Sequence, residues 1–291
     1  MNEPTHREMH EANRQSWNAA TVAHNSHKVD QSGFLRGGGT TLFPEEIELL
    51  GDVSNRRLVH LQCNSGQDTL SLTKLGAIVT GVDISDEAIE FAKKLSVESG
   101  IPGTFRRADL YEWFATQRNQ GEPFDIVFSS YGSICWLSDL AHWAAGVAAV
   151  LVPGGRFVVI DFHPMALMFN ERFELLFPYF GAGQPYKWDE GVSDYVGASG
   201  PALAPSGFAE GVREFQNPHP VYEFQWHLSA VFTALLNAGL RIEQFHEYPF
   251  FNGAKLYDTM REAPGRRMFL PDDVPSVPLM FGLTAMKPIV T

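Results

Sequence analysis

The chain has 291 residues, of which 44% are hydrophobic, and its formal net charge at pH 7 is −12. This length is enough for one large α/β domain with an insertion, or for two small domains. The acidic balance argues against a nucleic-acid or anionic-membrane surface, because phosphate groups are bound by clustered Lys and Arg. The arginine pairs at 56–57, 106–107 and 266–267 are isolated and read as solvated surface charge.

Cysteine content and hydropathy give further expectations. The chain has two cysteines, too few for a disulfide scaffold, and no Cys/His cluster at zinc spacing. We therefore expect two reduced thiols, Cys63 and Cys135, and no metal site. Apolar runs are shorter than a membrane span, and the polar start does not read as a secretory leader. We expect a cytoplasmic protein without membrane association, and the sequence leaves a homodimer open.

The first 50 residues precede the first predicted strand. Residues 8–22 have helical composition, with Trp17 as the large apolar anchor, and residues 34–41 contain three consecutive glycines. Pro44 opens a second helix that ends at Gly51. A segment that is part helix and part glycine loop is consistent either with a lid or with simple packing.

Apolar runs and helical segments alternate from residue 58 to residue 162. The predicted strands are 58–63, 78–83, 105–109, 124–129 and 156–162, and the predicted helices are 67–75, 85–98, 111–117 and 139–150. Strands that alternate with helices predict an α/β fold with a doubly wound, Rossmann-like parallel sheet.

The alternation stops at residue 164. Residues 164–222 are rich in aromatic residues, glycine and proline, which is typical of an inserted cap. A helix at 227–238 and strands at 240–248 and 279–287 then predict a final hairpin with one antiparallel strand. The expected organisation is an N-terminal helical or lid segment (1–50), a cofactor-binding core (51–163), a substrate cap (164–224) and the completion of the sheet (225–291).

The stretch from Leu58 to Asp83 is the centre of this pattern. It reads as a strand, a tight turn, a helix and a second strand that ends in a carboxylate. Parallel strands joined by a crossover helix end at the same edge of a sheet. Turn N–H groups and a carboxylate at this edge suit a nucleotide. The carboxylate can accept hydrogen bonds from both ribose hydroxyls.

Four stretches, taken together, resemble the class I S-adenosylmethionine-dependent methyltransferases of small molecules. They are VHLQCNSGQDTL, GVDIS, RRADLYEW, and FDIVFSSYGSICW followed by LVPGGRFVV. The first is similar to a bacterial subgroup with an LQC-x-x-G-x-D-T-L turn. The resemblance covers residues ~55–165 well and ~225–288 loosely. It implies a seven-stranded, mostly parallel sheet (five parallel strands plus the final hairpin), S-adenosylmethionine as cofactor and S-adenosylhomocysteine as product.

The resemblance also implies the cofactor-binding residues. Asp83 matches the acidic residue that binds the ribose hydroxyls, and Ala108 and Asp109 match adenine-binding positions, although Asp109 also suits a helix N-cap. Gln62 and Asn64 stand where the family usually has glycine. The full set is Gln62, Cys63, Asn64, Gly66, Asp83, Ile84, Ala108, Asp109, Leu110, Ser129 and Ser130.

Acceptor and catalytic candidates follow the predicted strands or lie in the N-terminal segment. His163 and His227 are candidate general bases, with capping or packing as the alternative for each. Tyr131 is a candidate for binding the nucleophile. The candidate acceptor-binding residues are Trp17, Phe34, Tyr131, Trp136 and His163.

These features predict an enzyme that transfers a methyl group to an oxygen or nitrogen atom of a small, largely apolar or aromatic metabolite. An NAD-dependent oxidoreductase is the first alternative, but the turn at 62–67 lacks Gly-x-Gly-x-x-Gly. A non-catalytic module that binds S-adenosylmethionine is the second.

Overall fold

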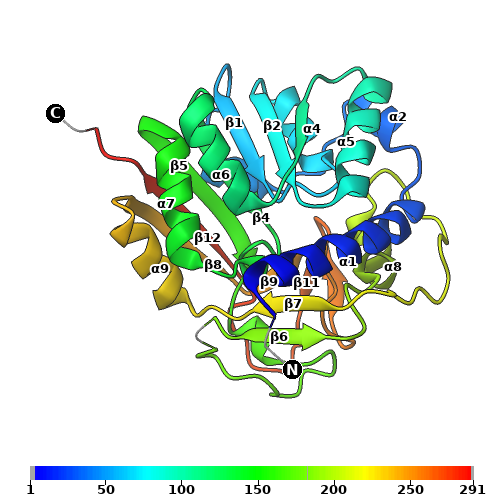
Figure 1. Ribbon diagram of the computed structural model, residues 1–291. Coiled ribbons are helices and arrows are strands. Elements are labelled where there is room, and N and C mark those ends of the chain that lie inside the picture. Colours follow the sequence, from blue (N-terminus) through cyan, green and yellow to red (C-terminus); the bar gives the residue numbers. More distant parts are fainter. Residues whose placement is uncertain (1–3, 182, 290–291) are drawn as a thin grey trace.

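A seven-stranded sheet forms the centre of the computed structural model, which describes residues 4–181 and 183–289. Its strand order is β3-β2-β1-β4-β5-β12-β8 (Figure 1). Neighbours from β3 to β5 are parallel, whereas β12 is antiparallel to both β5 and β8. The strands are Arg57–Leu61 (β1), Ile78–Asp83 (β2), Thr104–Arg107 (β3), Phe124–Ser130 (β4), Leu151–Phe162 (β5), Arg241–Tyr248 (β8) and Met280–Met286 (β12). This confirms the predicted fold class.

Helices cover both faces of the sheet because successive strand residues point to opposite faces. Val59 and its neighbours pack against α6 (Leu110–Gln120), α7 (Leu140–Val150) and α9 (Leu228–Asn237). Leu58 and its neighbours pack against α3 (Pro44–Leu50) and α4 (Gln67–Lys74). α5 (Asp86–Ser99) packs beside β3, on Phe105.

The long helix α1 (His6–Ser26) lies across the edge at which β1 and β2 end (Figure 1). Thr5 and Glu8 form a capping box at its start, which explains why it begins before the predicted residue 8. The glycine-rich stretch that follows is not wholly a loop. A short helix, α2 (Gln31–Arg36), buries Leu35.

The predicted cap contains a two-stranded sheet and short helices. β6 (Pro185–Trp188) pairs antiparallel with β7 (Val221–Phe224), and α8 (Tyr195–Ser199) and a 3-10 turn, η3 (Gly200–Leu203), lie between them in the chain. β6, β7 and α8 lie, like α1, beyond the end of the large sheet at which β1 and β2 end (Figure 1).

A second small sheet lies where the sequence predicted a loop. It contains β9 (Phe250–Asn252), β10 (Arg261–Ala263) and β11 (Arg267–Phe269). Strands of three residues are too short to give a period-two pattern. Tertiary packing of buried Phe251 and Met268 accounts for them instead.

β5 begins before residue 156, where the predicted strand starts. Pro153 to Gly155 belong to β5, where the pairing with β4 shifts register between Phe124 and Ile126.

Within residues 4–181 and 183–289, no helix has both the length and the apolar character needed to cross a membrane.

Candidate functional site

The turn after β1 is fixed to the end of β2 by one carboxylate. The backbone N–H of Asn64 donates to Asp83 Oδ2 at 2.7 Å, and that of Ser85 donates to Oδ1 at 2.8 Å. Gln62 and Asn64 have φ of 53° and 47°, the left-handed region that glycine favours. The two departures from the glycine pattern therefore keep a glycine-like backbone.

Gly66 is required by packing. Its φ is 76°, and a Cβ there would lie 2.7 Å from the Ala92 side chain and 2.8 Å from that of Phe105. Only a residue without Cβ lets α4 approach α5 and β3 this closely. The role of Gly66 in cofactor binding remains a prediction.

Asp83 keeps part of its surface exposed. Burial nevertheless raises its pKa to about 6, although hydrogen bonds from the backbone N–H groups of Ser85, Asn64 and Ile84 lower it. Partial exposure combined with strong desolvation is typical of a group in a recess. Its backbone oxygen accepts from the N–H of Ala108 at 2.9 Å. The structure thus brings the predicted ribose and adenine residues together.

Asp109 has two roles. Its Oδ1 caps α6 by accepting from the N–H of Tyr111 at 2.9 Å, as the sequence suggested. Its Oδ2 lies 2.6 Å from Nδ1 of His10 on α1. Leu110, the next predicted residue, belongs to the core under α6, whereas Ile84 stays partly exposed.

A cavity of about 250 Å³ opens beside Asp109. It lies next to the predicted adenine residues, and α1 forms one of its walls. Sequence reasoning missed His10, because its contact with Asp109 joins residues 99 positions apart. The cavity is lined by His6, Arg7, His10, Asp109, Tyr111, Glu112, Ser138, Asp139 and His142.

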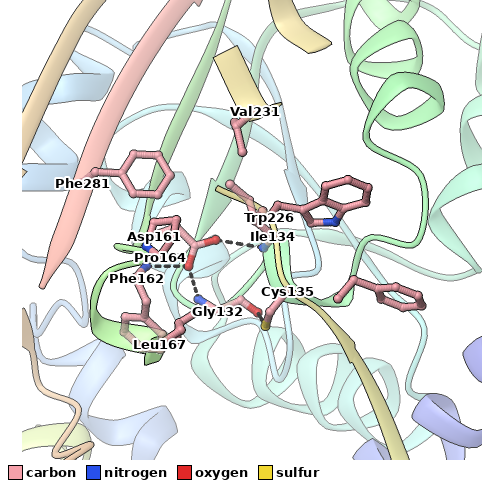
Figure 2. Close-up of a pocket in the computed structure, with 11 residues that line it drawn as sticks. Gly132, Ile134, Cys135, Asp161, Phe162, Pro164, Leu167, Trp226, Val231 and Phe281 are labelled. Carbon is pink, nitrogen blue, oxygen red and sulfur yellow. Dashed lines mark hydrogen bonds between the residues drawn. The ribbon is translucent and has the colours of Figure 1, made fainter. Parts of the chain in front are cut away.

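A buried carboxylate shapes the loop after β4. Asp161 accepts from the N–H groups of Gly132 and Ile134, the latter at 2.9 Å (Figure 2). It also accepts from the N–H of Ser133 at 3.0 Å. Burial raises its pKa, although these donors oppose the shift. Its place in β5 suggested only a strand residue, so sequence reasoning missed it.

Two predicted serines at the end of β4 point inward. Ser130 Oγ is 3.1 Å from Nε2 of His60, and Ser129 Oγ is buried without a partner among the described residues. On the adjacent turn, Gln62 donates from Nε2 to the Ser133 carbonyl at 2.9 Å. These contacts join the turn after β1 to the loop after β4.

Tyr131 has φ of 41° and belongs to a buried polar group. Its hydroxyl donates to Glu46 and accepts from Nδ2 of Asn252 at 2.9 Å. The pKa of Glu46 is raised well above its usual range by burial. The neighbouring Glu45 pairs with Arg267 instead. In the sequence, both glutamates are only acidic residues in the first turn of the predicted helix, so sequence reasoning missed this polar group.

Two of the predicted acceptor residues meet. The rings of Trp17 and Trp136 lie 5.5 Å apart, and Tyr195 of the cap lies 6.3 Å from Trp17. Phe34 does not join them, because it packs with Leu35 against the core beside α5.

The two predicted histidine bases lie elsewhere. His163 is 4% exposed; its Nδ1 accepts from the Met165 N–H at 3.0 Å and its Nε2 is 3.2 Å from Glu247 of β8. Its pKa is lowered by burial, against the pull of Glu247. His227 caps α9 by accepting from the Ala230 N–H at 3.1 Å. The base role of both histidines is an untested prediction.

The cysteines are free thiols, and burial raises the pKa of each. Cys63 lies under the turn after β1, and Cys135 lies in the 3-10 turn η1 (Ile134–Trp136). In the part of the chain that the structure describes, no three His, Cys, Asp or Glu side chains gather as metal ligands would.

Comparisons with known proteins match the part of the chain that contains these residues. Residues 59–155 match the family model described as "Methyltransferase domain". A ubiquinone biosynthesis O-methyltransferase of Saccharophagus degradans is 30% identical over 125 residues, which are 42% of this chain and 51% of the relative. That of Nitrosomonas europaea is 35% identical over 80 residues, 28% of this chain and 33% of the relative. The chain therefore spans about half the length of the curated relatives it matches, or less.

Solved structures agree on the fold. A methyltransferase of Mesorhizobium loti, dependent on S-adenosylmethionine, aligns with a TM-score of 0.54 and 20% identity, over 86% of this chain and 99% of the other. One from Clostridium acetobutylicum aligns with a TM-score of 0.52 and 12% identity, over 88% and 90%.

Proposed function

We propose that this chain, which belongs to the class I S-adenosylmethionine-dependent methyltransferases by its domain at 59–155 and its fold, transfers a methyl group to an oxygen or nitrogen atom of a small metabolite. One observation carries the proposal. Asp83 is hydrogen-bonded both to Asn64, in the turn at 62–66, and to Ala108, which precedes Asp109. One edge thus offers a carboxylate for the ribose and a second carboxylate for the adenine.

Lys28 suits the carboxylate of the methionine moiety. It is only partly exposed, and the structure gives its ammonium no ion pair among the described residues. Burial lowers its pKa to about 8, although Asp68 opposes this shift. An uncompensated cation in such a place is costly unless an anion binds there. Lys28 follows α1, whose Asn25 donates to Ser65 Oγ at 2.8 Å and so lies beside the turn.

The acceptor would lie between the loop after β4 and the cap. The sulfonium of the cofactor supplies the activated methyl group. The protein must then align the acceptor and exclude water, which suits the aromatic group of Trp17, Trp136 and Tyr195. The curated relatives are named O-methyltransferases, which is compatible with an oxygen acceptor.

Isothermal titration calorimetry with S-adenosylhomocysteine and with NAD tests the proposal. We expect S-adenosylhomocysteine to bind and NAD not to bind. Asp83→Ala should weaken binding by about 10-fold or more, since charge-assisted hydrogen bonds to the ribose contribute about 1.5 kcal/mol or more. Glu90→Gln, on the exposed face of α5, is the charge-matched control. Binding of NAD alone, or an unchanged affinity in Asp83→Ala, would overturn the assignment.

A further inference from the structure

Glu223 of β7 is a carboxylate without a cation. Its Oε2 accepts one hydrogen bond, from the indole Nε1 of Trp188 at 3.0 Å. Within residues 4–181 and 183–289, no Lys, Arg or His nitrogen lies within 4.0 Å of it. Burial raises its pKa, and the Trp188 hydrogen bond opposes this only in part. A carboxylate with so little compensation carries a free-energy cost that a cationic ligand would remove.

The strand register places Glu223 on an aromatic face. Residues opposite each other in an antiparallel pair share a face, and so do residues two apart in one strand. Tyr186 is opposite Glu223, and Trp188 is opposite Val221. Val221 in turn packs with Trp17 and Trp136.

This face borders the predicted reaction centre. Cys135 precedes Trp136 in η1. Its thiol pKa is raised first by burial and second by the negative charge of Glu223. η1 follows the loop at the end of β4, where the methionine and sulfonium end of the cofactor is expected. Glu223 is therefore near the acceptor side of the site, beyond the cofactor itself.

Charge complementarity then identifies the ligand. In the proposed cofactor site, Asp83 would bind the ribose hydroxyls and Lys28 the methionine carboxylate. No group of the cofactor is proposed as the partner of Glu223. The aromatic side chains on its face (Trp17, Trp136, Tyr186 and Trp188) each keep part of their surface exposed. Aromatic rings attract cations through their quadrupoles, and they bury the apolar body of a ligand.

We propose that Glu223 and these rings bind the protonated amino group of the methyl acceptor, which is thus a small amine with an apolar or aromatic body. This inference rests on the proposed methyltransferase function and narrows its acceptor class. An acid of the same size is excluded by repulsion from Glu223, and a neutral alcohol gains no charge interaction there.

The test uses the full chain saturated with S-adenosylhomocysteine, with calorimetry of tryptamine, 2-phenylethylamine and their hydroxyl counterparts, tryptophol and 2-phenylethanol. Each amine should bind at least about 10-fold more tightly than its alcohol, as expected for a desolvated charge pair. Glu223→Gln should remove this preference and leave the affinity for S-adenosylhomocysteine within about twofold. Glu190→Gln, an exposed carboxylate in the same cap, should retain the preference.

The outcomes separate the two proposals. Failure of the wild-type chain to bind S-adenosylhomocysteine overturns the proposed function. If S-adenosylhomocysteine binds, three results would overturn the amine inference alone. These are that neither amine binds, that the alcohols bind as tightly as the amines, or that Glu223→Gln keeps the amine preference. The amine-to-alcohol comparison in the wild type decides the matter even if Glu223→Gln does not fold.

Discussion

His10 and Asp109 join the N-terminal helix to the adenine edge of the sheet. Nδ1 of His10 lies 2.6 Å from Oδ2 of Asp109, and its Nε2 lies 2.9 Å from Oγ of Ser138. The imidazole is also stacked on Tyr111, with ring centroids 5.5 Å apart and planes 12° from parallel. Both ring nitrogens are therefore engaged, and α1 is held over the place where adenine is expected to lie.

This contact predicts that His10 controls cofactor exchange. We expect a cofactor under α1 to leave when the helix moves, which would break both hydrogen bonds of His10. His10→Ala should speed the release of S-adenosylhomocysteine by about 10-fold, since two partly buried hydrogen bonds contribute about 1–3 kcal/mol in total. Stopped-flow displacement measures this rate.

The matched control for this experiment is His6→Ala. His6 lines the same cavity from α1, but the structure gives its side chain no hydrogen bond among the described residues. Equal release rates for wild type, His6→Ala and His10→Ala would show that α1 does not retain the cofactor through this contact.

The raised pKa of Asp83 predicts a pH dependence of cofactor binding. Ribose hydroxyls donate to the ionised carboxylate, so binding must expel the proton that the free protein holds below about pH 6. Affinity for S-adenosylhomocysteine should be constant above about pH 7 and fall by up to about 10-fold per pH unit below 6. Asp83→Asn should bind weakly at every pH, and a wild-type affinity that is flat from pH 5 to 8 would contradict the assignment.

The same group has the opposite effect on the stability of the free protein. Its folded pKa of about 6 exceeds the ordinary value of 3.8, so the folded state binds the proton more tightly than the unfolded state does. Its contribution to stability is present below pH 3.8 and is lost as the pH rises through about 6. Saturating S-adenosylhomocysteine should reverse this trend in thermal unfolding.

The Tyr131 hydroxyl is predicted to stabilise the buried polar group at α3. Tyr131→Phe leaves the fully buried Glu46 without its phenol donor. Removing one partner of a buried pair costs about 1–3 kcal/mol, which urea unfolding measures. Tyr248→Phe is the control, because its hydroxyl makes no hydrogen bond to the described residues, and it should change stability by about 0.5 kcal/mol or less. Equal unfolding midpoints for the two variants would contradict the role of Tyr131.

Local pattern was sufficient for the central sheet. The strands and helices from residue 57 to residue 162 agree with the prediction to within a few residues, because each buried strand is flanked by helix caps such as Ser85 and Asp109. The antiparallel last strand also agrees. These features depend on neighbours in the chain, which the sequence displays directly.

Residues that act through contacts with distant parts of the chain could not be predicted from the sequence. His10, Asp161 and Glu223 have their partners in other elements, and a single sequence contains no record of such contacts. Phe34 was chosen for its aromatic side chain, but the packing of α2 on α5 directs it to a different core. Composition identifies which side chains are available, and only the tertiary packing selects among them.

The packing of Gly66 makes the last prediction. Gly66→Ala combines a positive φ with a Cβ that would lie 2.7 Å from Ala92. A left-handed non-glycine residue costs about 1–2 kcal/mol, and overpacking adds about 1–3 kcal/mol. Gly100 supplies the control, since its φ is 70° and a Cβ there meets nothing within 4 Å. Gly100→Ala should therefore cost only the backbone term, and urea unfolding should place Gly66→Ala about 1–3 kcal/mol below it. If the two variants lose equal stability, close packing is not the reason that this position is glycine.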